Sequence, residues 1–362
     1  MLQTSTSRLA YSFLSAAFLT AVALPASAQQ IQRTPALEKL VKDAQAEKTL
    51  NLSWGPSLGS AGGVKQLQDA INKEFGINIS ITYTPGPAMP QLASRIIQEI
   101  DAGKTPTSDL VLGAETTFTQ LLRAKALIPV RWSDYFTTIT PEMQTKDGTA
   151  VHIVTLVTGI HYNTELIKPN EVPRKMADIF NPKWKGRIAG TIYAAGFDRI
   201  ALKRGIDAIR PVVQKTGEWA GGLIRCGENE RIASGEFVML FLDCGKTDDR
   251  LMVEKGGPLN QVVIEDAALT TNWFWGLPKG VQKPNLAILF AGFVASPPGQ
   301  KIIDTVAGAS SHFVPGTSAY KAVKELEARG AEILTQTPDE LLVREAELDK
   351  YRNEFQQLLR QK

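Results

Sequence analysis

The chain has 362 residues, of which 43% are apolar and 21% are charged, and 40 Lys and Arg against 37 Asp and Glu give a formal net charge of +3. This balance is typical of a soluble globular protein with enough apolar residues for more than one core, and it excludes a disordered or fibrous chain. The small positive excess forms no basic run, so we do not expect nucleic acid as a partner. Three histidines and two cysteines are too few for a common zinc cluster, and we expect no cofactor.

An apolar stretch opens the chain, with Arg8 in front of residues 9–24 and Ala26-Ser27-Ala28 at the position of a cleavage site. These features predict a secretory signal peptide over residues 1–28. A membrane anchor is the alternative, but polar residues interrupt the stretch and Pro25 ends it. No cysteine follows the cleavage site, so we expect no lipid attachment there. The protein is therefore predicted to be exported to the periplasm.

Strands and helices alternate along the first half of the mature chain. In order, the expected elements are a helix over Pro35–Glu47, a strand over Leu50–Trp54, a helix from Val64 to Phe75, a strand over Ile77–Tyr83, a helix over Met89–Ile100 and a strand over Asp109–Leu112. Apolar strands that alternate with helices predict a mostly parallel sheet with helices on both faces.

A second α/β unit follows. Its expected elements are a strand over Arg187–Gly190, a helix over Phe197–Ala208, a strand over Gly222–Arg225, a helix over Asn229–Ser234 and a strand over Phe237–Asp243. The β-branched run Val151–Tyr162 can carry the chain between the two units. Two more helices, Asn285–Ala295 and Gly299–Ala307, come later. We expect a first lobe over residues 33–155 with about 280–315 returning to it, and a second over 156–275 with about 316–362 packed on it.

The last segment carries a helix start signal. Thr337 and Glu340 form a capping box, and Pro338 stands at the first helical position. One apolar stripe follows, made of Leu341, Leu348, Phe355 and Leu359. It predicts a helix packed on a lobe, with a coiled-coil partner site as the alternative.

Six short stretches, taken in chain order, resemble the family 1 extracellular solute-binding proteins of bacterial ABC importers, particularly the branch that includes the ferric-iron binding proteins. The stretches are Thr107–Val111, Leu121–Pro129, Gly159–Thr164, Asn181–Ile188, Ile232–Glu236, and Lys283–Ala287 leading to Ser296–Gln300. The resemblance implies an α/β, two-lobed periplasmic-binding-protein fold, with hinge-linked lobes and a ligand cleft between them. It also implies a membrane permease as partner and no catalytic activity, and we expect a monomer.

The cleft residues are expected on loops that follow strands, because ligands of open parallel sheets bind beyond the carboxyl ends of the strands. Glycines and hydroxyls in the loop of residues 55–63 can bring backbone amides to an anion. Arg225 ends a strand and is our preferred anion anchor, with an interlobe or surface salt bridge as its alternative role. The full set of expected ligand contacts is Trp54, Ser57, Gly59, Ser60, Glu115, Thr116, Tyr193, Arg225, Asp243 and Trp273.

The predicted ligand is a small anionic organic solute, and there are three alternative functions. Ferric iron is disfavoured because the iron-binding members use neighbouring tyrosines, and no adjacent pair of tyrosines occurs here. A polyamine remains open because it would use aromatic walls and carboxylates, which this sequence offers at Trp54, Trp273, Trp275, Glu115 and Asp243. An enzyme on this fold is least favoured, since the sequence has neither paired zinc-binding histidines nor a nucleophile elbow.

The chain has two cysteines, Cys226 and Cys244, each directly after an expected strand of the second unit. Neighbouring parallel strands would bring both sulfurs to one edge of the sheet, and an exported protein meets oxidising conditions. We therefore predict a Cys226–Cys244 disulfide, with two free thiols as the alternative.

Overall fold

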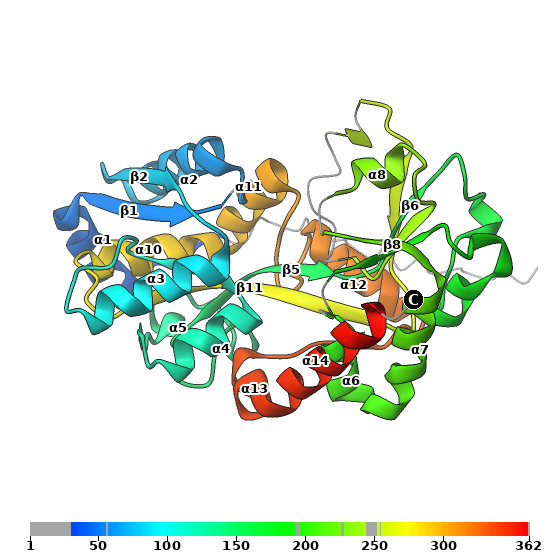
Figure 1. Cartoon of the computed structure of the whole chain (residues 1–362). Coiled ribbons are helices and arrows are strands. Elements are labelled where there is room, and N and C mark those ends of the chain that lie inside the picture. The colour runs from blue at the N-terminus through cyan, green and yellow to red at the C-terminus, as the bar shows by residue number, and fades with distance from the viewer. Residues whose placement is uncertain are drawn as a thin grey trace, which may run out of the picture.

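The structure is a computed structural model that describes residues 30–360, except 56, 193, 195, 226–227, 244–251 and 254. Two α/β lobes stand side by side, and two strands, β5 (Val151–Val157) and β11 (Ala268–Pro278), run between them (Figure 1). The main core of the first lobe draws on residues 31–156 and 275–314, and that of the second on residues 160–269 and 334–359. The expected two-lobed α/β fold is confirmed, whereas the predicted signal peptide lies outside the described residues.

The sheets of lobe 1 place its strands around β11. Strand β1 (Thr49–Trp54) pairs in parallel with β2 (Ser80–Pro85), and β11 pairs antiparallel with β3 (Val111–Ala114), β4 (Leu127–Ile128) and β5. The helices of this lobe are α1 (Pro35–Glu47), α2 (Ser60–Phe75), α3 (Met89–Asp101), α4 (Glu115–Arg123), α5 (Trp132–Tyr135), α10 (Pro284–Ala295) and α11 (Pro297–Ala307).

Lobe 2 is built on a five-stranded sheet. Its order is β10 (Leu259–Val262), β6 (Ile160–Asn163), β9 (Met239–Phe241), β7 (Ile188–Thr191) and β8 (Ala220–Ile224). Strand β7 is parallel to both β8 and β9, so the carboxyl ends of these three strands share one edge. The helices are α6 (Phe197–Arg204), α7 (Ile206–Trp219) and α8 (Glu230–Ala233), and α14 (Glu345–Arg360) packs on α6 and α7.

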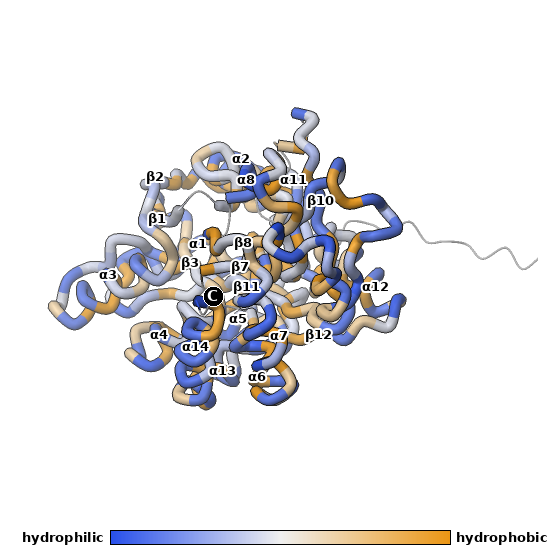
Figure 2. The backbone as a smooth tube through the Cα atoms, turned by 45° about the vertical axis from the view of Figure 1, so that its right-hand side comes forward, coloured by the Kyte–Doolittle hydropathy of each residue, from blue (hydrophilic) through white to orange (hydrophobic). Residues whose placement is uncertain are grey.

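Local sequence signals explain the best-predicted helix boundaries. Thr34 caps α1 by accepting a 3.1 Å hydrogen bond from Leu37 N, and Pro35 occupies the first turn. The apolar residues of α1 recur at helical spacing, and all four are buried: Leu37, Leu40, Val41 and Ala44. Outer helices such as α3 and α12 (Ser318–Ala328) alternate between hydrophilic and hydrophobic residues along the tube (Figure 2). The apolar face of each such helix packs inward, and its polar face meets solvent.

One expected helix ends early, and the helix that follows it was not expected from the sequence. The helix expected over Phe197–Ala208 stops at Arg204, because Gly205 adopts a φ of 87° and starts a new helix, α7. Helix α7 continues to Trp219 in spite of Pro211, which as a helix breaker hid this element in the sequence.

The C-terminal stripe lies on two helices, α13 (Pro338–Val343) and α14, rather than on one. The capping box of Thr337 and Glu340 is confirmed, with both reciprocal hydrogen bonds formed. The four stripe residues are buried, as a helix packed on a lobe requires. Helix α13 lies against α4 of lobe 1, a contact that the sequence did not predict.

In the described part of the chain, no single helix is long and apolar enough to cross a membrane. Only α10 and α11 counted together, at 73° to each other, meet that test.

The tight packing of α10 yields a stability prediction. A Cβ added at Gly292 would overlap the ring of Phe136, whereas one added at Gly62, in the exposed part of α2, would meet nothing within 4 Å. Gly292→Ala should lower the free energy of unfolding by about 2 kcal/mol, because the buried ring must shift. Gly62→Ala should raise it by about 0.5–1 kcal/mol through helix propensity. Urea titration measures both, and equal effects would show that Phe136 moves freely.

Candidate interlobe binding site

Strand ends from both lobes converge between the lobes. Strand β1 of lobe 1 points toward lobe 2 (Figure 1), and β1 lies next to β3. From the other side, Arg199 on the helix after β7 lies 3.3 Å from Glu115, the residue that follows β3. Asp243, two residues after the end of β9, accepts a hydrogen bond from Gly159, which lies between β5 and β6. The carboxyl ends of parallel strands thus meet at the interlobe face, where ligand loops are expected.

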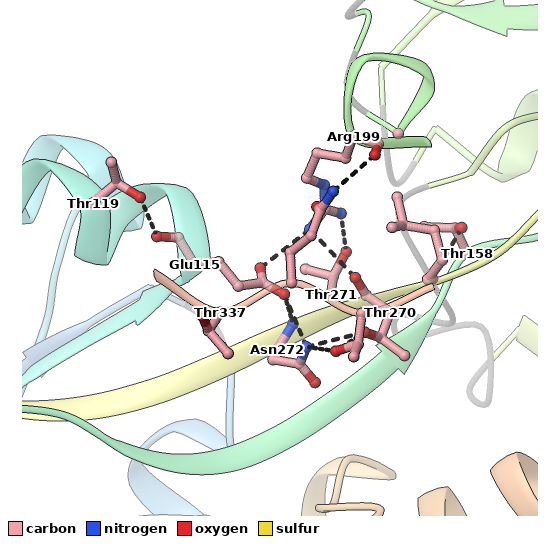
Figure 3. A network of polar contacts seen from close by, with 12 residues as sticks. Glu115, Thr119, Thr158, Arg199, Thr270, Thr271, Asn272 and Thr337 are labelled. Carbon is pink, nitrogen blue, oxygen red and sulfur yellow. Dashed lines mark hydrogen bonds and ion pairs between the residues drawn. The ribbon is translucent and has the colours of Figure 1, made fainter. Parts of the chain in front are cut away.

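The centre of this face is a buried ion pair held on strand β11. Glu115 Oε1 accepts hydrogen bonds from the backbone N (2.6 Å) and Nδ2 (3.0 Å) of Asn272, while its Oε2 lies 3.3 Å from Arg199 Nη1 (Figure 3). Burial raises the pKa of the Glu115 carboxyl, and the positive charge of Arg199 opposes that rise. The carboxylate is therefore tied to the opposite lobe and to the crossing strand at once.

Arg199 is fixed by the same strand. Its Nη1 donates to Thr270 O at 3.3 Å, and its Nη2 donates to Thr271 Oγ1 at 2.6 Å (Figure 3). Asp198, the preceding residue, is buried and accepts the backbone N–H of Arg199 at 2.7 Å and Nε of Arg352, on α14, at 3.0 Å. These contacts hold the start of α6 against the hinge.

A second polar cluster joins β5 to the segment after α11. His152 Nε2 lies 3.1 Å from Asn272 Oδ1 and from Thr155 Oγ1, and its Nδ1 lies 3.0 Å from Ser311 Oγ. His312 Nδ1 lies 2.6 Å from Thr155 Oγ1. Burial lowers the pKa of His152 to about 3 and that of His312 to about 4. Asn272 connects this cluster to Glu115, so the polar contacts form one chain across the hinge.

Asp243 has a comparable role in lobe 2. It is buried, with Oδ1 accepting Gly159 N at 2.7 Å and Oδ2 accepting Gln261 Nε2 at 2.8 Å. The same Oδ2 lies 2.8 Å from Nδ1 of His161. These contacts fasten the end of β9 to the turn between β5 and β6.

The loop after β1 rests on the core of lobe 1. Trp54 is 1% exposed, packs with Tyr83 and Trp275, and donates its indole N–H to Ser57 O at 3.0 Å. Its side chain therefore supports the loop from the core instead of facing a ligand. Gly59 has a φ of 75°, and a Cβ there would lie 2.9 Å from Cγ2 of Val306. The loop thus needs glycine where it meets α11.

The other expected contacts are spread over the interlobe face. Ser57 and Ser60 are partly exposed beside Gly59, and Thr116 is exposed on the first turn of α4. Trp273 is partly buried on β11, against the core of lobe 1. Tyr193 lies outside the described residues.

Arg225 stands exposed at the carboxyl end of β8. Its backbone N donates to Glu228 Oε2 at 3.2 Å, and within the described residues its guanidinium takes part in no ion pair. The alternative role of Arg225 in a salt bridge thus has no partner in that part of the chain.

A cavity of about 1020 Å³ opens between the lobes. Lobe 1 lines it with the end of α11, lobe 2 with β10, and the hinge with residues 155–157 of β5 and the start of α12. These walls were not predicted from the sequence, although the helix that ends at Ala307 was, because no local pattern tells which end of a helix meets the other lobe. The lining includes Thr155, Thr164, Asn260, Gln261, Asp304, Thr305, Ser310 and Ser318, along with valines, leucines and alanines.

The chain belongs to the bacterial extracellular solute-binding protein family, whose model matches residues 66–331. The family resemblance drawn from the sequence motifs is confirmed. Its members are extracellular solute-binding proteins, which implies a small-molecule ligand. A comparison of the sequence with curated proteins gave no match.

Solved structures of two-lobed binding proteins share the fold. Iron-bound HitA from Pseudomonas aeruginosa has a TM-score of 0.66 at 19% identity, over 86% of this chain and 99% of that one. The substrate-binding protein of an ABC transporter from Agrobacterium tumefaciens has a TM-score of 0.68 at 16% identity, over 88% and 97%. AgtB from A. tumefaciens R10, in complex with agropinic acid, has 0.63 at 16%, over 86% and 99%. Family and fold together define a two-lobed extracellular solute-binding protein.

The interlobe ion pair predicts strong coupling in a double-mutant cycle. Glu115→Gln or Arg199→Met alone should each lower the free energy of unfolding by about 3 kcal/mol or more, because each leaves one buried charge uncompensated. The double variant should lose clearly less than the sum of the two, since no lone charge remains. Urea titration of the four proteins measures the coupling. Additive losses would mean that the two charges do not depend on each other.

The buried histidines predict a loss of stability in acid. Their folded pKa values of about 3 and about 4 lie below the ordinary value of 6.5, so the unfolded chain binds more protons between pH 4 and 6.5. Stability is therefore complete above pH 6.5 and should fall below it, by up to about 1.4 kcal/mol per pH unit for each histidine. Urea titrations across this range measure the slope. His312→Gln should reduce it, and an unchanged slope would contradict the assignment.

Proposed function

We propose that this protein is the periplasmic receptor of an ABC importer and captures a small anionic organic solute between its lobes, which it delivers unchanged to the permease. The observation that carries the anionic assignment is Arg225, an exposed guanidinium at the edge where the strand ends of lobe 2 meet lobe 1, with no ion-pair partner in the described residues. A guanidinium binds carboxylate, phosphate or sulfonate through two parallel hydrogen bonds.

Helix starts of lobe 1 support the same charge preference. Helices α2 and α4 follow β1 and β3, and neither has a side-chain hydrogen bond at its N-cap. Helix N-termini carry partial positive charge and present unpaired N–H groups to anions. Ser57, Gly59 and Ser60 lie at the start of α2, and Thr116 lies at the start of α4. We propose these residues as ligand contacts from lobe 1, and Arg225 as a contact from lobe 2, with Tyr193 kept from the sequence prediction.

The interlobe cavity suits the uncharged part of such a solute. Within the described residues, its lining contains no lysine or arginine and a single carboxylate, that of Asp304. Asp304 accepts hydrogen bonds from Ser310 Oγ at 2.9 Å and from Ser318 N at 2.9 Å, so its charge is directed to the start of α12. The remaining polar groups are hydroxyls and amides. A volume of about 1020 Å³ is large enough for an organic molecule.

Neither cation alternative finds comparable support. For iron, the described residues contain no group of three or more His, Cys, Asp or Glu that could hold a metal ion, and the sequence from 244 to 251 has no tyrosine. For a polyamine, Trp54 and Trp275 are buried in the core, Glu115 is paired with Arg199, and Asp243 holds the turn after β5. The groups that a cation would need are engaged elsewhere.

Lobe closure is the proposed mechanism of capture. A solute that contacts Arg225 from one lobe and the start of α2 from the other binds the closed form better than the open form, and only such a difference shifts the equilibrium. The permease can then distinguish loaded from empty receptor by shape. The family is extracellular, and removal of the predicted signal peptide of residues 1–28 would leave the mature receptor in the periplasm as a monomer.

Cys226 and Cys244 lie outside the described residues, so their disulfide stays a prediction. Thiol titration of the denatured, unreduced protein tests it, since two free thiols per chain would refute the bridge.

A thermal-shift screen tests the proposed function. Organic acids, phosphorylated sugars and sulfonates, with polyamines and ferric complexes as competitors, should include an anionic solute that raises the melting temperature. Calorimetry should then show that Arg225→Ala weakens binding of that solute by about 2 kcal/mol or more, because a charge-assisted pair is lost. Arg131→Ala, which removes an arginine that is exposed just before α5 of lobe 1 and pairs with Asp134, should bind like the wild type. Tight binding of a cation, or equal affinity of Arg225→Ala and wild type, would overturn the anionic assignment.

A further inference from the structure

The C-terminal part of the chain joins the two lobes a further time. Residues 333–345, here called the C-terminal strap, comprise β12 (Ile333–Leu334), helix α13 and the start of α14. The strap begins on the hinge itself, because β12 pairs in parallel with Ala268 and Leu269 of β11. Thr335 Oγ1 then bonds to Thr270 Oγ1 at 2.9 Å and accepts from Asn272 Nδ2 at 3.3 Å. The strap is therefore anchored on the strand that also carries the interlobe ion pair.

The middle of the strap contacts lobe 1. Helix α13 packs along α4, which starts with Glu115. Asp339 Oδ2 accepts the backbone N–H of Lys146 at 3.3 Å, and Glu345 forms an ion pair with Arg123 at the end of α4. These contacts reach lobe 1, whereas α14 packs on α6 and α7 of lobe 2.

The same strap contacts lobe 2. Gln336 Nε2 donates to the carbonyl of Arg199 at 2.8 Å, and Leu341 forms a buried cluster with Leu202 of α6 and Leu348 of α14. Helix α13 thus fills the space between α4 of one lobe and α6 of the other. In both overall views it lies on the side of the crossing strands away from α2 and α8 (Figures 1 and 2). No strap residue is in the lining of the interlobe cavity.

From this arrangement we propose that the C-terminal strap restrains the angle between the lobes. When the strand-end face closes by rotation about β5 and β11, α4 and α6 move apart on the opposite side of the hinge, and α13 must then lose its contacts to one of them. Within each lobe the core is close-packed and moves as a unit, so the cost of rotation falls on these few contacts. The strap therefore opposes closure and keeps the empty receptor from closing until the contacts of a solute outweigh it. This role rests on contacts within the chain and does not depend on which solute is bound.

The test compares two ways of weakening the C-terminal contacts. Asp339→Ala with Glu345→Gln removes the two polar contacts of the strap to lobe 1. Glu354→Gln is the matched control, because it removes the ion pair of α14 with Arg210, which lies within lobe 2. All proteins are measured without solute, by small-angle X-ray scattering and by hydrogen exchange, after thermal melting has shown that they are folded.

The strap variant should have a smaller radius of gyration than the wild type, because it closes more readily, and amides of residues 339–343 should exchange about fivefold faster, as expected for the loss of two exposed polar contacts. The control should match the wild type in radius and in exchange of α13. A radius of the strap variant equal to or larger than that of the wild type, or an equal decrease in the control, would overturn the proposal. Should the double variant fail to fold, Glu345→Gln alone gives the same comparison. Because no solute is present, failure of the strap leaves the proposed function standing.

Discussion

The burial of two opposite charges from different lobes against one strand is the constraint on which this structure depends. Glu115 and Arg199 both bond to β11, and each is the only full countercharge within 4 Å of the other's buried side chain in the described chain. A buried charge without a partner is strongly destabilising, so the pair has to stay together at whatever angle the lobes adopt. In the proposed lobe closure, the rotation axis therefore passes close to this pair. Contacts further from it, at the strand-end loops and at the strap, are the ones that change.

Polar contacts around β11 extend this constraint through the whole hinge. Asn272 bonds to Glu115 on one side and lies against His152 on the other, and Thr155 connects His152 to His312. Both histidines are kept neutral by burial, so the cluster adds hydrogen bonds to the hinge without adding charge. A hinge fixed in this way leaves the loops after β1, β3 and β8 free to meet a solute. The rigid hinge and the loops proposed to meet the solute are thus built from adjacent residues.

Much of the fold follows from local signals that the sequence contains. The bounds of α1 follow from Thr34, Pro35 and the apolar spacing, and the capping box at Thr337 marks the start of α13. The ordered motifs identify the family, and with it the two lobes. Contacts between side chains of the two lobes could not be predicted in this way, because no local sequence signal connects Glu115 to Arg199 or Asp339 to Lys146. Trp54 shows the same limit, since an aromatic residue before a glycine-rich loop fits a ligand wall as well as a core.

Capture by lobe closure is tested most directly by small-angle X-ray scattering of the wild-type protein, with and without a saturating solute identified by its binding. The radius of gyration should fall on binding, because the solute draws the strand-end loops of the two lobes together about the hinge at β11. An unchanged radius at saturation would contradict capture by lobe closure.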